Sequence, residues 1–127
     1  MQRLRATTPD DSRVAALAGG RANARPEHVV AAAREGDAFA RAEFDRFNHY
    51  LARGIVNLAF ALAPEVVILG TIPTHAGDEL CFTPVREQVA ANLWPVLADG
   101  LRIVPAALGE DLPYYAGVCV AERGERG

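Results

Sequence analysis

Cysteine is scarce in this chain of 127 residues, which contains only Cys81 and Cys119. The two cysteines lie far apart, and neither has a partner at the spacing of a metal site. We therefore expect two unlinked thiols rather than a disulfide framework or a metal centre.

Long apolar runs and basic runs are also missing. No apolar segment approaches the ~18–20 residues that cross a bilayer, and the first six residues lead into polar ones rather than into the apolar core of a signal peptide. We therefore expect a cytoplasmic protein without a membrane partner. Thirteen basic residues against sixteen acidic ones give a net charge of −3. This balance argues against direct nucleic-acid binding.

The composition that remains is that of one globular domain. Half of the residues are hydrophobic, which is typical of a folded α/β domain and too many for a disordered chain. The sequence predicts a weakly structured opening segment at 1–25, an α/β lobe at 26–123 and a short tail at 124–127. Within the opening segment, residues 14–18 favour a short helix.

The clearest periodic signal follows Asp37, which is a plausible N-cap. Apolar side chains recur at spacings of three or four and predict one long helix that ends at Pro64. We expect this stripe to lie in the core. Its members are Phe44, Phe47, Leu51, Ile55, Leu58 and Leu62.

Residues 64–71 read PEVVILGT and predict a buried strand that leads into a turn. Proline ends the helix, four branched or aliphatic residues follow, and a glycine closes the run. In open α/β sheets, ligands bind at such strand ends. A turn is expected over 71–78.

The remaining pattern alternates helix and strand. Thr83 is expected to cap a helix that has Pro84 at its first position. The apolar stripe of that helix consists of Val85, Val89, Leu93 and Val96. Further elements are a helix over 26–36, a strand over 102–105 and a last helix over about 113–122. This order predicts parallel strands joined by helical crossovers. Two strands make a thin sheet, which indicates that the chain is one lobe of a larger fold.

Five short motifs resemble segments of the ROK family (repressors, open reading frames and sugar kinases). In that family a G-D-x-x-A helix opening, a G-hydrophobic-x-N-hydrophobic segment and an N-P-E strand closed by two glycines come first. A small-Gly-x-x-Leu helix opening and an I-x-x-A-x-L-G tail follow. No single motif is decisive, but the five occur in the family's order over residues 27–122. The matching runs are GDAFA at 36–40, GIVNL at 54–58, APEVVILG at 63–70, AGDEL at 76–80 and RIVPAALG at 102–109.

The resemblance implies an actin-like ATPase fold with two RNase-H-like lobes, of which this chain would supply one incomplete α/β lobe. Family members phosphorylate hexoses with ATP, or use the same sugar pocket to control a DNA-binding domain. The family's D-x-G-G-T phosphate loop, its aspartate base and its zinc loop match nothing in this sequence. We therefore expect no catalytic residue and no zinc ligand here, and a truncated or split member of the family.

The resemblance assigns contact with the cofactor ATP to Gly70, Thr71 and Gly77. Thr71 stands where the family has a second glycine, whose missing side chain lets the backbone approach the nucleotide closely. The threonine hydroxyl could still donate a hydrogen bond. The plain alternatives are that Gly70 is an ordinary turn glycine and that the residues around Gly77 only start a helix.

For the other polar and aromatic residues, a structural role is the default expectation. His75 is expected to be a loop histidine, and Asn57 a polar packing residue on the long helix. Trp94, Tyr114 and Tyr115 could stack on an adenine ring, but burial in the core is the default.

The leading hypothesis is the C-terminal lobe of a ROK-type, glucokinase-like sugar kinase that is inactive alone. One alternative is a fragment of a ROK-type, sugar-responsive transcriptional regulator. Another is an interaction module that completes a separate N-terminal half through its exposed sheet edge. Expected partners are a nucleotide and either a second copy of the chain or the missing N-terminal lobe.

Overall fold

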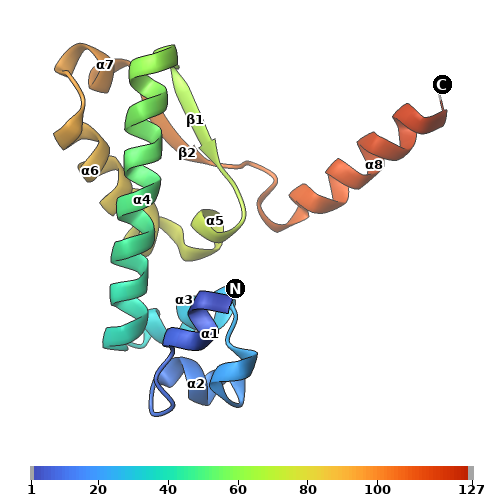
Figure 1. The fold of residues 1–127 in the computed structure, drawn as a ribbon. Coiled ribbons are helices and arrows are strands. Elements are labelled where there is room, and N and C mark those ends of the chain that lie inside the picture. The colour runs from blue at the N-terminus through green and yellow to red at the C-terminus, as the bar shows by residue number, and fades with distance from the viewer. Residues whose placement is uncertain (1, 126–127) are drawn as a thin grey trace.

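The structure, a computed structural model, describes residues 2–125. Eight α-helices, three short helical turns and two strands make up this part of the chain (Figure 1). In chain order they are α1 (Gln2–Thr7), α2 (Arg13–Ala18), η1 (Arg21–Asn23), α3 (Pro26–Arg34), α4 (Ala38–Leu62), β1 (Val66–Leu69), α5 (Ile72–Gly77), η2 (Asp78–Phe82), α6 (Thr83–Asn92), α7 (Pro95–Gly100), β2 (Arg102–Pro105), η3 (Gly109–Asp111) and α8 (Leu112–Glu125).

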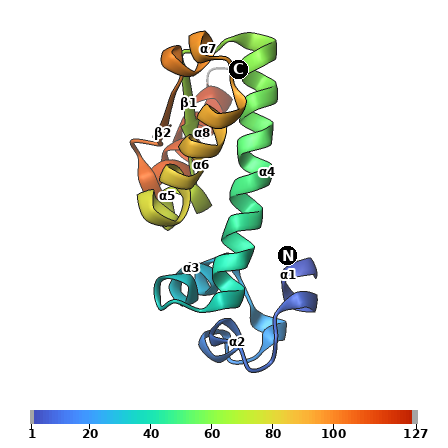
Figure 2. The same ribbon diagram turned by 90° about the vertical axis from the view of Figure 1, so that its left-hand side faces the viewer.

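Helix α4 is the spine of the molecule. Figure 2 shows α1, α2 and α3 gathered around its N-terminal part, while the two strands and helices α5, α6 and α7 lie beside the rest of it. Asp37 caps α4 as predicted, because its Oδ1 accepts a hydrogen bond from the backbone N–H of Ala40 at 2.8 Å. The helix ends at Ala63, whose backbone is left-handed, directly before Pro64.

The opening segment is more structured than its sequence predicts. The predicted helix over 14–18 is present as α2, with Ser12 as its cap. It buries Val14 completely and packs against α3. Helices of about six residues show too few turns for a periodic pattern, so packing rather than propensity defines them. The division at residues 25 and 123 stays a prediction.

The predicted core stripe on α4 is only half correct. Phe44 and Ile55 are buried, but the exposed fraction of Leu58 is 50% and that of Leu62 is 71%. The face that packs inward is turned around the helix axis relative to the stripe, and alanines let α6 and η2 approach it closely. The buried residues of α4 are Ala40, Phe44, Asn48, Ala52, Ile55 and Ala59.

Strands β1 and β2 pair in parallel, with Val67 opposite Ile103, as the helical crossover pattern predicted. Val67, Leu69 and Ile103 pack into the core with α4 and α6. The expectation of a buried strand is wrong for the other face of β1. Val66 is 38% exposed and Ile68 is 62% exposed, because no element among the described residues covers that face.

The predicted turn over 71–78 is largely helical. Residues 72–77 form α5, and η2 continues into α6 as a single π-helical turn in which the N–H of Thr83 donates to Asp78 O. Thr83 is therefore not an N-cap, contrary to the prediction. The wide π-turn explains how Pro84, which has no N–H to donate, sits inside a continuous helical run.

The last helix, α8, extends away from the rest of the structure (Figure 1). Tyr114 and Tyr115 lie exposed on it, and Trp94 is exposed before α7, where its ring packs edge-on against Phe60. The default expectation of burial is therefore wrong for all three aromatic residues. None of the helices described here is both long enough and apolar enough to span a membrane.

Candidate functional site

The carboxyl end of β1 forms a tightly held corner. Leu69 O accepts one hydrogen bond from the N–H of Ala106, at 2.9 Å, and another from the hydroxyl of Thr74, at 3.0 Å. These two bonds tie the end of β1 to the residue after β2 and to the first turn of α5. Because the strands are parallel, both end at the same edge of the sheet, where an α/β fold presents its ligand-binding turns.

Thr71 has the backbone conformation of a glycine. Its φ is 54° and its ψ is −119°, a combination that costs a residue with a side chain on the order of 1–3 kcal/mol. Such strain persists only where the surrounding structure imposes it. Thr71 is exposed and makes no side-chain cap for α5, while its carbonyl accepts from His75 N at 3.0 Å.

Gly77 lies at the other end of α5. Its φ is 78°, and a Cβ built on it would meet no atom within 4 Å. The glycine is therefore required by its backbone angle rather than by a close neighbour. The structure brings Gly70 and Thr71 together at one corner and places Gly77 one short helix away. Their use as nucleotide contacts stays a prediction.

Arg34 contacts α5 close to this corner, although its place in the sequence did not indicate it. Arg34, at the end of α3, donates through Nη2 to the backbone carbonyl of His75 at 2.9 Å. This bond links α3 to α5. The sequence gives no sign of this contact, because Arg34 and His75 are 41 positions apart.

Among the described residues, neither a metal-binding cluster nor an activated thiol is found. Among the residues whose side chains are described, no cluster of three or more His, Cys, Asp or Glu could hold a metal ion. Cys81 is fully buried, and burial raises the pKa of its thiol to about 11. A thiol that stays protonated at neutral pH is a structural residue rather than a nucleophile.

Asn48 ties α4 to the π-helical turn. It is 1% exposed, and its Nδ2 donates to the carbonyl of Leu80 at 2.8 Å. Its Oδ1 has no hydrogen-bond partner. A buried amide of this kind fixes the position of η2, and with it the residues that follow Gly77.

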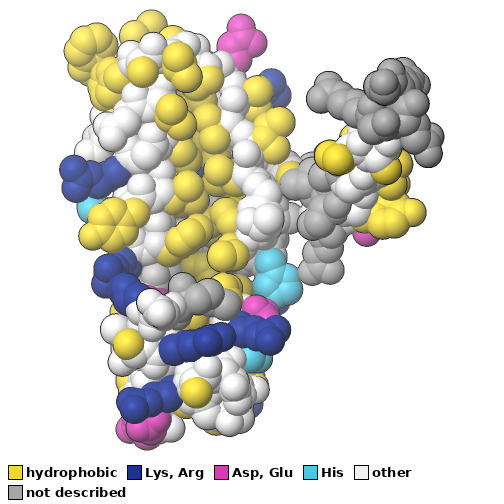
Figure 3. Space-filling view, turned by 45° about the vertical axis from the view of Figure 1, so that its right-hand side comes forward, with side chains coloured by type: hydrophobic (Ala, Val, Ile, Leu, Met, Phe, Trp, Pro, Cys, Tyr) yellow, Lys and Arg dark blue, Asp and Glu magenta, His cyan; other side chains and the backbone are white. Residues whose placement is uncertain are grey.

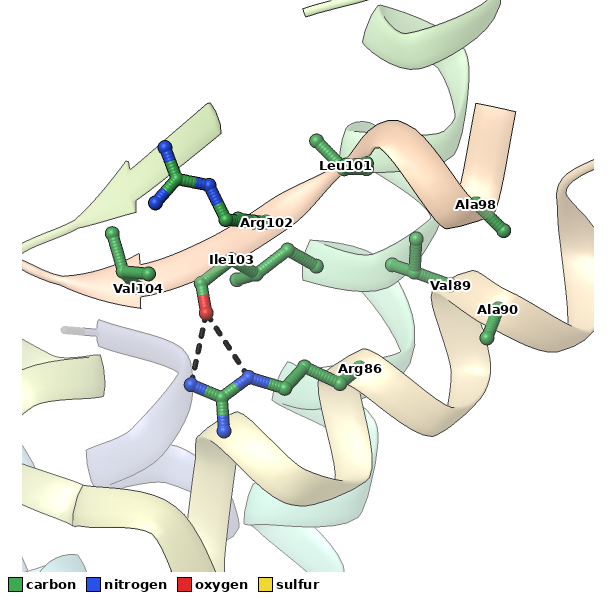
Figure 4. Close-up of a pocket in the computed structure, with 8 residues that line it drawn as sticks. All are labelled: Arg86, Val89, Ala90, Ala98, Leu101, Arg102, Ile103 and Val104. Atoms are coloured by element: carbon green, nitrogen blue, oxygen red, sulfur yellow. Dashed lines mark hydrogen bonds between the residues drawn. The ribbon is translucent and has the colours of Figure 1, made fainter. Parts of the chain in front are cut away.

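Two hollows lie away from this corner. One, of about 350 Å³, is bounded by α6, α7 and β2, and Arg86 closes one side of it (Figure 4). The other, of about 370 Å³, lies between α4 and α6 and carries mostly polar side chains. Asn57 is exposed in this second hollow, so the expectation of a packing role is wrong. Its polar lining consists of His49, Arg53, Asn57, Gln88 and Asn92.

Comparison with known proteins defines the class. The described residues form a parallel α/β lobe with a possible ligand-binding turn at the end of β1. The sequence model of the ROK family matches residues 11–118. The chain belongs to the ROK family.

The curated relatives include two glucokinases. That of Halalkalibacterium halodurans is 38% identical over 89 residues, which are 70% of this chain and 27% of the relative. That of Thermotoga maritima is 37% identical over 95 residues, which are 75% of this chain and 30% of the relative. The chain thus spans less than a third of the length of these relatives.

Two solved structures share the fold. A ROK family transcriptional regulator, a homologue of the E. coli MLC protein, superimposes with a TM-score of 0.64 over 82% of this chain and 24% of its own. The protein described as a putative sugar kinase from Cytophaga hutchinsonii gives a TM-score of 0.59 over 68% of this chain and 28% of its own. Both are 22% identical to this chain, so they establish the fold alone.

Proposed function

We propose that this chain is the C-terminal lobe of a cytoplasmic, glucokinase-like ROK sugar kinase, in which the corner after β1 holds the phosphates or the ribose of ATP. Gly70, Thr71 and Gly77 are the proposed contacts. Backbone N–H groups would act as the donors, because Gly70 and Thr71 carry no basic side chain.

One observation carries this proposal. The backbone at Thr71 keeps the angles of a glycine although a β-branched residue stands there. Because the fold keeps this turn despite the strain, the shape of the turn serves a purpose other than stability. In an exposed corner beside a helix start, close approach of a ligand to the backbone is the purpose that fits best.

The chain alone is not expected to phosphorylate a sugar. Phosphoryl transfer requires an acceptor hydroxyl, a base and a phosphate-binding loop held in line with one another. The motifs that supply the base and the loop in the family match nothing in this sequence.

The test is a chimera in which residues 11–118 replace the matching segment of the Thermotoga maritima glucokinase. We expect the chimera to bind ATP and to phosphorylate glucose, and Thr71→Gly to lower its KM for ATP. Thr83→Gly, placed away from the corner, serves as the matched control and should leave this KM unchanged. A folded chimera that binds no ATP would refute the proposal.

A second candidate is a fragment of a ROK-type regulator. The solved regulator aligns with more of this chain than the solved kinase does, 82% against 68%. In that case the corner needs no nucleotide, and the chimera would fold and bind glucose without binding ATP.

A further inference from the structure

The polar hollow of about 370 Å³ between α4 and α6 is lined by two short rows of side chains. His49, Arg53 and Asn57 follow one another at intervals of four on α4. Gln88 and Asn92 are spaced in the same way on α6. Residues four apart lie one above the other on the same side of a helix, so the two rows present their polar groups to one shared space.

Other parts of the surface differ from this hollow in character. Leu58 and Leu62, on another side of α4, are exposed apolar residues. Figure 3 shows hydrophobic side chains along the middle of the face that it presents, with Arg and His side chains at its margins. The polar character of the hollow is therefore local, and it follows from the two rows of side chains that line it.

The charge of the lining favours an anion. The lining contains Arg53 and His49 but no Asp or Glu, although acidic residues outnumber basic ones by 16 to 13 in the whole chain. Asp45 and Glu87, which lie close by in the sequence, are exposed and do not line the hollow. The Arg53 guanidinium forms no ion pair or hydrogen bond with any residue that the structure describes. A guanidinium in this setting can bind a carboxylate or a phosphate through two parallel hydrogen bonds.

The amide side chains add donors and an acceptor. Nδ2 of Asn92 donates to the backbone carbonyl of Gln88 at 2.7 Å, and this bond holds the Asn92 side chain against α6. Its Oδ1 is left as an acceptor, while the amides of Asn57 and Gln88 each offer both donors and an acceptor. The lining can therefore bind the oxygens of an anion and can also accept a hydrogen bond from a hydroxyl group.

The size of the hollow fits a small molecule better than a bare ion. Its volume of about 370 Å³ falls within the ~300–1,000 Å³ of small-molecule sites. A water molecule takes up about 30 Å³, so inorganic phosphate, with the bulk of a few waters, would leave most of the space to solvent. Ala52, which is buried, and Val56, which is half-buried, supply an apolar surface for the body of a larger ligand.

We propose that the hollow between α4 and α6 binds a small anion, about the size of a monosaccharide, that carries hydroxyl groups and one phosphate or carboxylate group. Arg53 binds the charged group, and the amides of Asn57 and Gln88 donate to its remaining oxygens. Asn92 accepts a hydrogen bond from a hydroxyl group of the ligand. This site is separate from the corner after β1, and the proposal does not depend on ATP binding there.

The test is an NMR titration of the isotope-labelled chain, followed through the side-chain amide signals of Asn57, Gln88 and Asn92, which report on the hollow itself. The probes are glucose 6-phosphate, gluconate, inorganic phosphate and glucose. We expect at least one of the two larger anions to shift these signals to saturation, at least ~tenfold more tightly than inorganic phosphate. Glucose, which lacks the charge, should cause no shift. Binding of glucose 6-phosphate alone would assign a phosphate to the ligand, and binding of gluconate alone a carboxylate; either result supports the proposal.

Arg53→Gln should weaken binding at least ~tenfold, because it removes the charge-assisted hydrogen bonds. Arg53→Lys should restore part of the affinity, since lysine keeps the charge but lacks the planar fork. Arg46→Gln is the matched control, because it removes the same charge from an exposed position on α4 outside the hollow.

Three results would each overturn the proposal. They are unchanged binding to Arg53→Gln, an equal loss in Arg46→Gln, and the absence of any shift of the three amide signals with either larger anion. Inorganic phosphate that binds as tightly as the larger anions would overturn it as well, because the hollow would then hold an adventitious ion only.

Discussion

Arg86 holds the backbone of Ile103 with a two-pronged hydrogen bond, at 3.0 Å from Nε and 2.9 Å from Nη2. The same guanidinium forms an ion pair with Asp78 through Nη1 at 3.0 Å and lies over the ring of Phe82, 5.3 Å from its centre. One side chain thus joins α6, the π-helical turn and the outer strand of the sheet.

Loss of this arginine should destabilise the fold. Arg86→Met keeps an apolar stem but leaves the Ile103 carbonyl without its donor, and hydrogen bonds to a charged group are worth about 1.5–3 kcal/mol. We expect the free energy of unfolding to fall by about 2 kcal/mol in urea titrations. Arg102→Met removes the same charge from the exposed side of β2 and should cost less than about 0.5 kcal/mol. Equal losses would contradict the role of the Ile103 bond.

Thr71→Gly should stabilise the isolated chain. The substitution relieves a strain on the order of 1–3 kcal/mol, and the added freedom of glycine in the unfolded chain takes back about 0.5–1 kcal/mol. We expect a net gain of about 1 kcal/mol, measured as a higher urea midpoint. Thr83→Gly is the control, since Thr83 has a helical φ of −62° and the same change there should cost about 1 kcal/mol. A Thr71→Gly variant that is less stable than the parent would show that the angle is not strained.

Asn48→Ala should cost about 2 kcal/mol, because it leaves the buried carbonyl of Leu80 without a donor and opens a small cavity. Asn57→Ala, on the exposed side of the same helix, is the matched control and should change stability by less than about 0.5 kcal/mol. Urea unfolding followed by circular dichroism measures both. Equal changes in the free energy of unfolding for the two variants would show that Asn48 does not hold η2 in place.

Stability should fall at alkaline pH because of Cys81. Burial raises the pKa of its thiol from 9.0 to about 11, so the folded chain keeps the proton while the unfolded chain loses it. The unfolded state therefore gains stability as the pH rises from 9 to 11, and the loss for the fold is on the order of 1–2 kcal/mol. The chain has no lysine, the residue that usually titrates in this range.

The measurement compares urea midpoints at pH 8 and pH 10.5 for the parent and for Cys81→Ala. We expect the variant to be less stable at pH 8 but to lose less between the two values. An identical loss in both proteins would assign the alkaline effect to other groups.

The parts of this fold that the sequence predicts correctly are those that depend on short-range interactions. The Asp37 cap, the helix end before Pro64 and the strand over 102–105 each follow from residues within a few positions. Helix α5 was missed because Pro73 and Gly77 are turn residues by composition, although a proline is also favoured in a first helical turn. The positive φ of Thr71 could not be predicted from the sequence, because threonine does not favour a left-handed backbone.

The stripe on α4 shows where such reasoning stops. Periodicity tells that Ile55 and Leu62 share one apolar side of the helix, but not which part of that side another element covers. In this chain α6 and η2 cover the part that includes Ile55 and leave Leu62 to solvent. Leu58 and Leu62 therefore lie exposed on α4.

This division gives a direct test on the isolated chain. Ile55→Ala should cost about 2–4 kcal/mol, because a large buried side chain is removed. Leu62→Ala, the matched control on the same stripe, should cost less than about 1 kcal/mol, because its side chain is 71% exposed. Urea unfolding of the isolated chain measures the cost of both variants. A Leu62→Ala variant that is as damaging as Ile55→Ala in the isolated chain would mean that the stripe is already covered without any partner.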